Sequence, residues 1–220
     1  MLKTIYLFIA LVIIGLIQSY RTPFWVDETF SKTNMQGNSY LQIIQGKMGE
    51  GCNNPLFYLI QKLDGDSRLF PIICMALAIS IVFYVLLKNF NIKYAVLGVV
   101  LFLLPKIMWQ HFAECRPYSL IVLLTTIQFT LHFLKRIKEI AFINILMAFT
   151  DSICIVPIIM SAFMAGKKYW WIAILPTIII AYYFSVSLYG HGTHLPGWSN
   201  RYLIYLLPIG ILKLVYWIER

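Results

Sequence analysis

Two acidic residues, Asp27 and Glu28, stand side by side two positions after Trp25. Tryptophan is enriched at the membrane–water interface, so the pair is expected close to the level of the lipid headgroups. Adjacent carboxylates repel each other, and one of them readily accepts a proton, as a general base must. The pair could also share a divalent metal ion. The alternative interpretation is a solvated acidic start of the loop, or a helix through Ser31 that is capped by Asp27 or Thr29.

A second polar cluster, from Gln110 to Ser119, lies between two apolar runs with almost no loop. A charged side chain at membrane depth costs about 2.5–3.5 kcal/mol, so Glu114 and Arg116 are expected to have a partner or a task. The two could pair with each other. Alternatively, Arg116 holds a phosphate, because a guanidinium donates to two oxygens at once. Arg201 allows the same two interpretations, a headgroup anchor or a phosphate ligand.

The chain that must position these residues is strongly apolar. Of its 220 residues, 60% are hydrophobic and 12% are charged, where soluble domains have about half and about a quarter. Its apolar runs match the length that crosses a hydrocarbon core of about 30 Å. These features exclude a disordered tail, a collagen and a water-soluble enzyme. They predict an all-α fold: one integral membrane domain over residues 1–220, a polytopic bundle of about eight helices. The apolar runs are Thr4 to Gln18, Leu69 to Leu87, Tyr94 to Trp109, Tyr118 to Leu134, Ile140 to Ala165 with a break at Thr150 to Ser152, Tyr169 to Tyr189, and Tyr202 to Ile218.

The charged residues predict how the bundle lies in the membrane. The net charge of +9 comes from basic residues scattered between the apolar runs, a pattern typical of membrane flanks and not of a nucleic-acid-binding face. A cytoplasmic N-terminus places most basic flanks inside and most acids outside. Residues 21–68 then form a long first outer loop with short interfacial helices, one of them starting near Asn54. Any chemistry is expected to face outward.

Five short motifs, taken in order, resemble the polytopic glycosyltransferases of the GT-C fold, in particular bacterial relatives of protein O-mannosyltransferases and of the lipid A aminoarabinose transferase. No motif is specific alone, but the five keep one order over most of the chain. They are W-x-D-E-x-x-S (Trp25 to Ser31), N-P-L-F-Y (Asn54 to Tyr58), R-L-F (Arg68 to Phe70), E-x-R-P-Y-S (Glu114 to Ser119) and R-Y-L-x-x-x-L-P (Arg201 to Pro208).

The resemblance implies a GT-C-like core module in the cytoplasmic (inner) membrane, with its active site facing outside. It implies that the donor is a polyprenyl-phosphate-linked sugar, the acceptor is a glycan, lipid or protein hydroxyl, and transfer is inverting. It also implies a role for each candidate residue. Asp27 and Glu28 are catalytic, Arg116, Arg201 and Tyr118 bind the donor phosphate, and Glu114, Asn54, Tyr58 and His111 contact the acceptor or support the site.

Two other kinds of protein fit the same pattern. One is a flippase or transporter of a lipid-linked sugar, for which Asp151 in the break after Thr150 would be the key residue. Transporter sites usually lie near the bilayer midplane between repeats, whereas these charges gather at the predicted outer ends of the runs. The other is a non-catalytic partner subunit.

Overall fold

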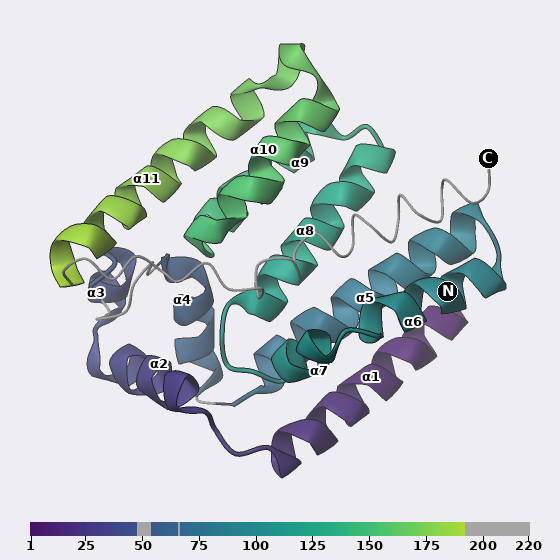
Figure 1. Ribbon diagram of the computed structural model, residues 1–220, viewed down its shortest axis with the longest axis horizontal. Helices are drawn as coiled ribbons and strands as arrows, with labels where there is room; N and C mark the ends of the chain where they lie inside the picture. The colour runs from purple at the N-terminus through teal and green to yellow at the C-terminus, as the bar shows by residue number, and fades with distance from the viewer. Residues whose placement is uncertain (48–53, 66, 192–220) are drawn as a thin grey trace.

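The computed structural model describes residues 1–47, 54–65 and 67–191, and within them every regular element is a helix and none is a strand (Figure 1). The predicted all-α class is confirmed. The α-helices are α1 (Leu2–Arg21), α2 (Val26–Gly37), α3 (Tyr40–Ile44), α4 (Pro55–Asp64), α5 (Leu69–Asn89), α6 (Ile92–Leu103), α7 (Lys106–Phe112), α8 (Tyr118–Phe133), α9 (Ile137–Ala148), α10 (Ile155–Ala165) and α11 (Trp171–His191). Two short 3-10 helices, η1 (Ser152–Cys154) and η2 (Lys167–Tyr169), precede α10 and α11.

Two of these helices, α1 and α5, are long and apolar enough to cross a membrane. A third candidate is the pair α6 and α7, which is bent by 80°. The bend falls at Pro105, whose ring and missing N–H interrupt a helix. In the described part of the chain, α8, α10 and α11 contribute shorter apolar stretches. The chain therefore has the helices of a membrane protein.

The centre of the bundle is α5, which packs against α1, α6 and α8. It is apolar on nearly every face, as expected for a buried helix, and Ile72, Met75 and Ile79 are fully buried. The contact with α1 is close because Gly15 has no side chain. A Cβ atom there would lie 2.6 Å from Ile72 and 2.7 Å from Phe112. Small residues allow such close approach between membrane helices.

The remaining long helices, α8 to α11, form a second layer beside α5. Buried amides join them: Gln128 Nε2 donates to Asn144 Oδ1 at 2.5 Å, and Asn144 Nδ2 donates to the Ile172 carbonyl at 3.1 Å. Hydrogen bonds of this kind hold helices together where the surroundings are apolar.

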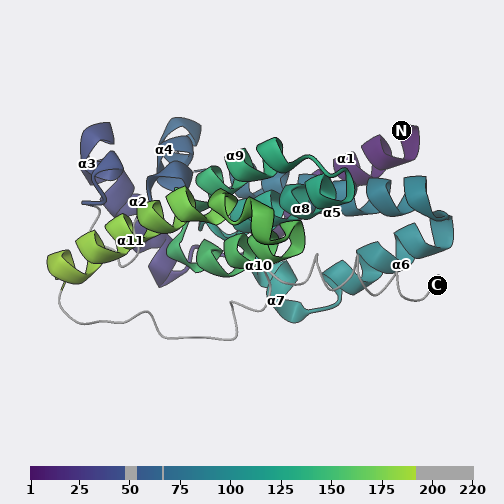
Figure 2. The same ribbon diagram turned by 90° about the horizontal axis from the view of Figure 1, so that it is seen from above.

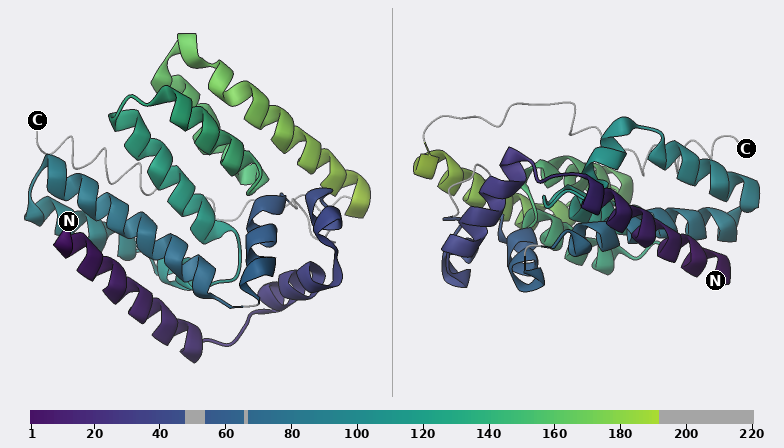
Figure 3. Two further views of the ribbon diagram at one scale, coloured as in Figure 1. Left: turned by 180° about the vertical axis from the view of Figure 1, so that it is seen from behind. Right: turned by 90° about the horizontal axis from the view of Figure 1, so that it is seen from below.

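The long helices run side by side, so their connections gather at two opposite ends (Figures 1 and 2). At one end lie α2, α3, α4 and the turns after α7 and α9. We call it the acidic end, after Asp27, Glu28, Asp64, Glu114 and Asp151. At the other end lie the N-terminus and the turns α5–α6, α8–α9 and α10–α11 (Figure 3). We call it the basic end. The three short helices α2 to α4 all lie in the polar segment 21–68.

Candidate functional site

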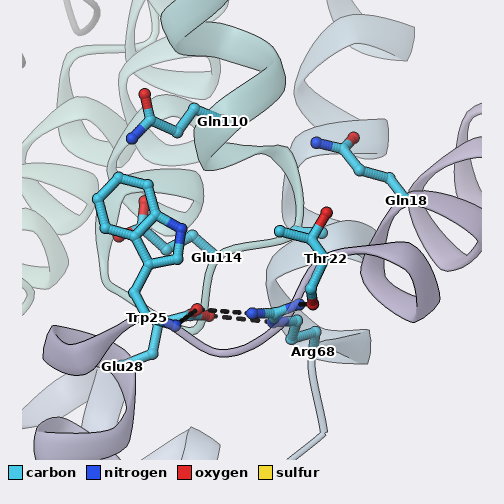
Figure 4. Close-up of a pocket in the computed structure, with 8 residues that line it drawn as sticks. Gln18, Thr22, Trp25, Glu28, Arg68, Gln110 and Glu114 are labelled. Atoms are coloured by element: carbon cyan, nitrogen blue, oxygen red, sulfur yellow. Dashed lines mark hydrogen bonds and ion pairs between the residues drawn. The ribbon is translucent and has the colours of Figure 1, made fainter.

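Glu28 lies at the centre of the acidic end, fully buried and paired with Arg68 (Figure 4). The Arg68 Nε and Nη2 atoms donate to the two carboxylate oxygens at 3.0 and 2.6 Å. The backbone N–H of Cys115 donates to Oε1 at 2.6 Å, and that of Trp25 donates to Oε2 at 3.0 Å. Both oxygens are therefore satisfied by N–H donors, as a buried carboxylate requires.

Arg68 uses its remaining N–H groups to close the end of α1. Nη1 donates to the carbonyls of Ser19 at 3.2 Å and Thr22 at 2.6 Å, and Nη2 donates to that of Pro23 at 3.0 Å. The guanidinium also lies 4.2 Å from the centre of the Phe24 ring, a cation–π distance. One side chain at the start of α5 thus fixes the exit of α1 and, through Glu28, the entry of α2.

The start of α2 differs from the cap that the sequence predicts. The cap at Asp27 or Thr29 is wrong: Trp25 is the N-cap, and Glu28 reaches back to its N–H. Asp27 is exposed, in the first turn of the same helix. Neighbouring residues on a helix point about 100° apart. One acid of the pair therefore faces the interior while the other faces solvent.

Arg116 reaches α2 from the loop before α8. Its Nη1 donates to the Ser31 hydroxyl at 2.6 Å. Ser31 stands four residues after Asp27, so the two lie one turn apart on the same side of α2. The predicted base and the predicted phosphate ligand are thereby brought to one short helix. The Arg116 guanidinium also lies 6.0 Å from the centre of the Tyr118 ring.

Glu114 and His111 form a buried pair of their own. The Nδ1 atom of His111 contacts Oε2 of Glu114, and both side chains are almost fully buried. The imidazole also packs on Tyr118, with ring centres 4.5 Å apart. These three predicted residues therefore form one cluster between α7 and α8, next to the Arg68–Glu28 pair.

A small hollow opens beside the Arg68–Glu28 pair, with the Trp25 indole along one side (Figure 4). Its free space is about 10 Å³, roughly what one water molecule needs, whereas ligand pockets begin at roughly 300 Å³. A sugar site must therefore extend beyond it. Asp27 and Arg116 are not among its described lining residues, which are Gln18, Thr22, Trp25, Glu28, Arg68, Gln110, Ala113 and Glu114.

Asn54 and Tyr58 belong to the start of α4, where Asn54 is the N-cap. Asn54 is fully buried: its Nδ2 donates to the Ala148 carbonyl, and its Oδ1 accepts from the Ser152 hydroxyl at 3.1 Å. The N–H of Leu56 donates to the Phe149 carbonyl at 2.8 Å. Tyr58 is buried in the core. Asn54 thus joins α4 to the turn after α9.

That turn brings a further acid, Asp151, to the acidic end. Its Oδ1 accepts from the Ile153 N–H at 2.9 Å and begins η1. Burial raises the pKa of Asp151 from 3.8 to about 6, against the lowering effects of that N–H and of the Arg116 charge. Asp151 is therefore close enough to Arg116 to feel its charge.

The raised pKa of Asp151 predicts a pH-dependent stability. Between about pH 4 and pH 6, the native state holds a proton that the unfolded chain has lost, so stability falls as the pH rises through this window. Asp151→Asn keeps the oxygen that accepts from Ile153. It is expected to be more stable than the wild type near pH 7 and equal to it near pH 4. Thermal unfolding in detergent at both pH values measures the difference in stability. If the stability of both proteins changes equally with pH, Asp151 is not the group responsible.

The donor set does not fit a divalent metal at Glu28, since both oxygens accept from N–H groups. In the part of the chain that the structure describes, no three His, Cys, Asp or Glu side chains come together as a metal site. Arg201, the other predicted phosphate ligand, lies outside the described residues, as do its motif up to Pro208 and the apolar run Tyr202 to Ile218.

The role of Arg68 is evident only in the structure. Arg68 opens the R-L-F motif, yet nothing in its spacing predicts that it pairs with Glu28. The one signal was its position, a charge directly before the apolar run that became α5.

The fold and this end of the bundle define an all-helical protein with helices fit to cross a membrane and charged groups gathered at their ends. Comparison with protein-family models, with curated proteins and with solved structures found no match.

Proposed function

We propose that the chain is a membrane glycosyltransferase that moves a sugar from a polyprenyl-phosphate donor to an acceptor hydroxyl. One observation carries the proposal: the Arg116 guanidinium donates to Ser31, which lies one turn after the exposed carboxylate of Asp27 on α2, at the ends of apolar helices. A donor whose lipid lies in the bilayer presents its phosphate and sugar at that level. The motif resemblance supports the same chemistry.

The reaction needs one base and a stabilised leaving group. Asp27 accepts the proton of the acceptor hydroxyl while its oxygen attacks the anomeric carbon. The bond between that carbon and the phosphate oxygen breaks, and its electron pair stays on the phosphate. Because attack comes from the side opposite the phosphate, the configuration inverts. The departing phosphate is a stable anion and needs positive charge, not an acid.

Arg116, with Tyr118 beside it, supplies that charge, and Arg201 is the second proposed ligand of the phosphate. Glu28 takes a different part from Asp27. With its oxygens held by Arg68 and two backbone N–H groups, it is a positioning residue that fixes the first turn of α2. His111 and Glu114 support Tyr118 from behind, and Asn54 and Tyr58 hold α4 in place beside α2.

The distribution of charge supports an orientation. Basic residues flank the helices at the basic end, so we place that end in the cytoplasm and the acidic end at the outer face of the cytoplasmic membrane. The acceptor, whether glycan, lipid or protein, then meets the donor outside. A cysteine placed at Asp27 should react with a membrane-impermeant thiol reagent in intact cells, and one placed at Lys168 should not.

Arg116→Ala is expected to weaken donor binding about 10- to 100-fold, because hydrogen bonds to a charged group contribute about 1.5–3 kcal/mol. Arg116→Lys keeps the charge but not the planar guanidinium, so its donor affinity should lie between those of the wild type and Arg116→Ala. The measurement is binding of a labelled polyprenyl-phosphate sugar to the purified protein in detergent. Unchanged affinity in Arg116→Ala would mean that Arg116 serves α2 through Ser31 and not the donor.

A further inference from the structure

Five cations gather at the corner of the basic end formed by the turns α8–α9 and α10–α11. We define this basic corner by Lys135, Arg136, Lys138, Lys167 and Lys168, all of which are exposed. They come from two segments about 30 residues apart in the sequence, and neither segment contributes to the acidic end. The proposed glycosyl transfer uses none of them.

A small apolar core holds the two turns together. Ile140 of α9, Ala162 of α10 and Ile172 of α11 pack into one buried cluster, with Tyr169 of η2 against it. Backbone conformation shapes both turns. Lys135 has φ +55° and Gly166 has φ +90°, the left-handed region in which glycine is favoured and other residues are uncommon. The cations are therefore carried on a defined scaffold.

The corner keeps a strong excess of positive charge. Glu139 is the only acidic residue in the two stretches 133–140 and 163–171. It accepts from Arg136 Nε at 2.8 Å and from Nη2 at 2.5 Å. This pair is 57% and 40% exposed, so it is worth little to stability. It offsets one cation and leaves four.

Exposed aromatic side chains border the cations, on α10, at the end of η2 and at the start of α11. Trp170, Trp171 and Phe163 are 49%, 50% and 64% exposed, and Trp170 packs edge-on against Phe163 with ring centres 5.2 Å apart. Lys168 Nζ lies 5.6 Å from the centre of the Tyr169 ring. Tryptophan rings beside lysines mark the depth at which lipid headgroups meet acyl chains.

We propose that the basic corner is a binding site for an anionic phospholipid of the leaflet at this end. The lysines face the headgroup phosphate, and the exposed tryptophans lie along the first part of the acyl chains. Clusters of lysine and arginine directly beside membrane helices favour acidic lipids. The two-turn scaffold makes this a local site and not a uniform property of the basic end. The inference does not depend on glycosyl transfer.

Two matched triple variants test the locality of this site. K138Q/K167Q/K168Q removes three cations from the corner, and K3Q/K88Q/K93Q removes three exposed cations from elsewhere at the basic end. Each purified protein is titrated in detergent micelles with fluorescent phosphatidylglycerol and, separately, with phosphatidylcholine. Far-UV circular dichroism and gel filtration check folding. Should the first triple variant misfold, Lys167→Gln and Lys168→Gln serve singly.

We expect the corner variant to bind phosphatidylglycerol at least about tenfold more weakly than the wild type, and the control variant to stay within about twofold. Binding of phosphatidylcholine should be weak in all three proteins. Inorganic phosphate should compete poorly, because it lacks the acyl chains that meet the tryptophans. The proposal is overturned if the two triple variants lose equal affinity for phosphatidylglycerol. It is also overturned if the two lipids bind equally well, or if inorganic phosphate competes fully.

Discussion

Arg68→Leu is expected to lower the free energy of unfolding by about 3–5 kcal/mol, the usual cost of leaving one partner of a buried ion pair alone. The reason lies in the surroundings of Glu28, which is fully buried and receives two of its four hydrogen bonds from Arg68. The substitution also frees the carbonyls of Ser19, Thr22 and Pro23 at the end of α1. Denaturant or thermal unfolding in detergent measures the loss.

The chain offers a matched control in its exposed pair, Arg136 and Glu139. Arg136→Leu also removes the arginine of an arginine–glutamate pair, but this pair is exposed to solvent. The substitution is expected to lower the free energy of unfolding by about 1 kcal/mol or less. The double variant E28Q/R68M should recover part of the loss, because no unpaired charge is left buried. If Arg68→Leu costs no more than Arg136→Leu, the Arg68–Glu28 pair does not hold the acidic end together.

Asp27→Asn is expected to reduce glycosyl transfer by about 10²- to 10⁴-fold, the range over which a general base contributes. Its effect on stability should be small, since Asp27 is exposed in the first turn of α2, where a favourable charge contributes about 0.3–1 kcal/mol. The measurement is product formation in membranes with the amount of folded protein held equal. Asp27→Glu restores a carboxylate one methylene further out and should recover some activity.

Glu28→Gln separates the two acids. It should lose stability and activity together, because it breaks the contacts that position α2, whereas Asp27→Asn should lose activity alone. Full transfer by Asp27→Asn would show that the base lies elsewhere. Donor binding by Asp27→Asn should match the wild type, since the donor phosphate is assigned to Arg116.

The helices could be predicted from the sequence because a long apolar run has few other ways to satisfy its backbone in a membrane. The run Leu69 to Leu87 became α5, and the break at Thr150 to Ser152 leads into η1. The run Tyr94 to Trp109, by contrast, is divided at Pro105 into α6 and α7. The distribution of charge between the two ends also followed from the order of the runs.

The partners inside the site could not be predicted in this way. Asp27 and Glu28 are neighbours in sequence, and only the contacts of α2 with Arg68 and with the backbone of Cys115 decide which of them is buried. The partner of Glu28 lies 40 residues away, and that of Asn54 lies 94 residues away. Such contacts depend on how helices meet, which short motifs do not encode.

Whether this chain catalyses transfer at its acidic end can be decided by an assay of turnover. Purified protein in nanodiscs receives a polyprenyl-phosphate sugar labelled in the sugar, together with candidate acceptors, and the products are separated and their anomeric configuration determined. We expect release of the polyprenyl phosphate, an acceptor product of inverted configuration, and loss of both in Asp27→Asn. In parallel proteoliposomes, movement of the labelled lipid across the bilayer without turnover would identify a flippase. If the folded protein, given donor and acceptor, shows no turnover and no lipid movement, it is not a glycosyltransferase.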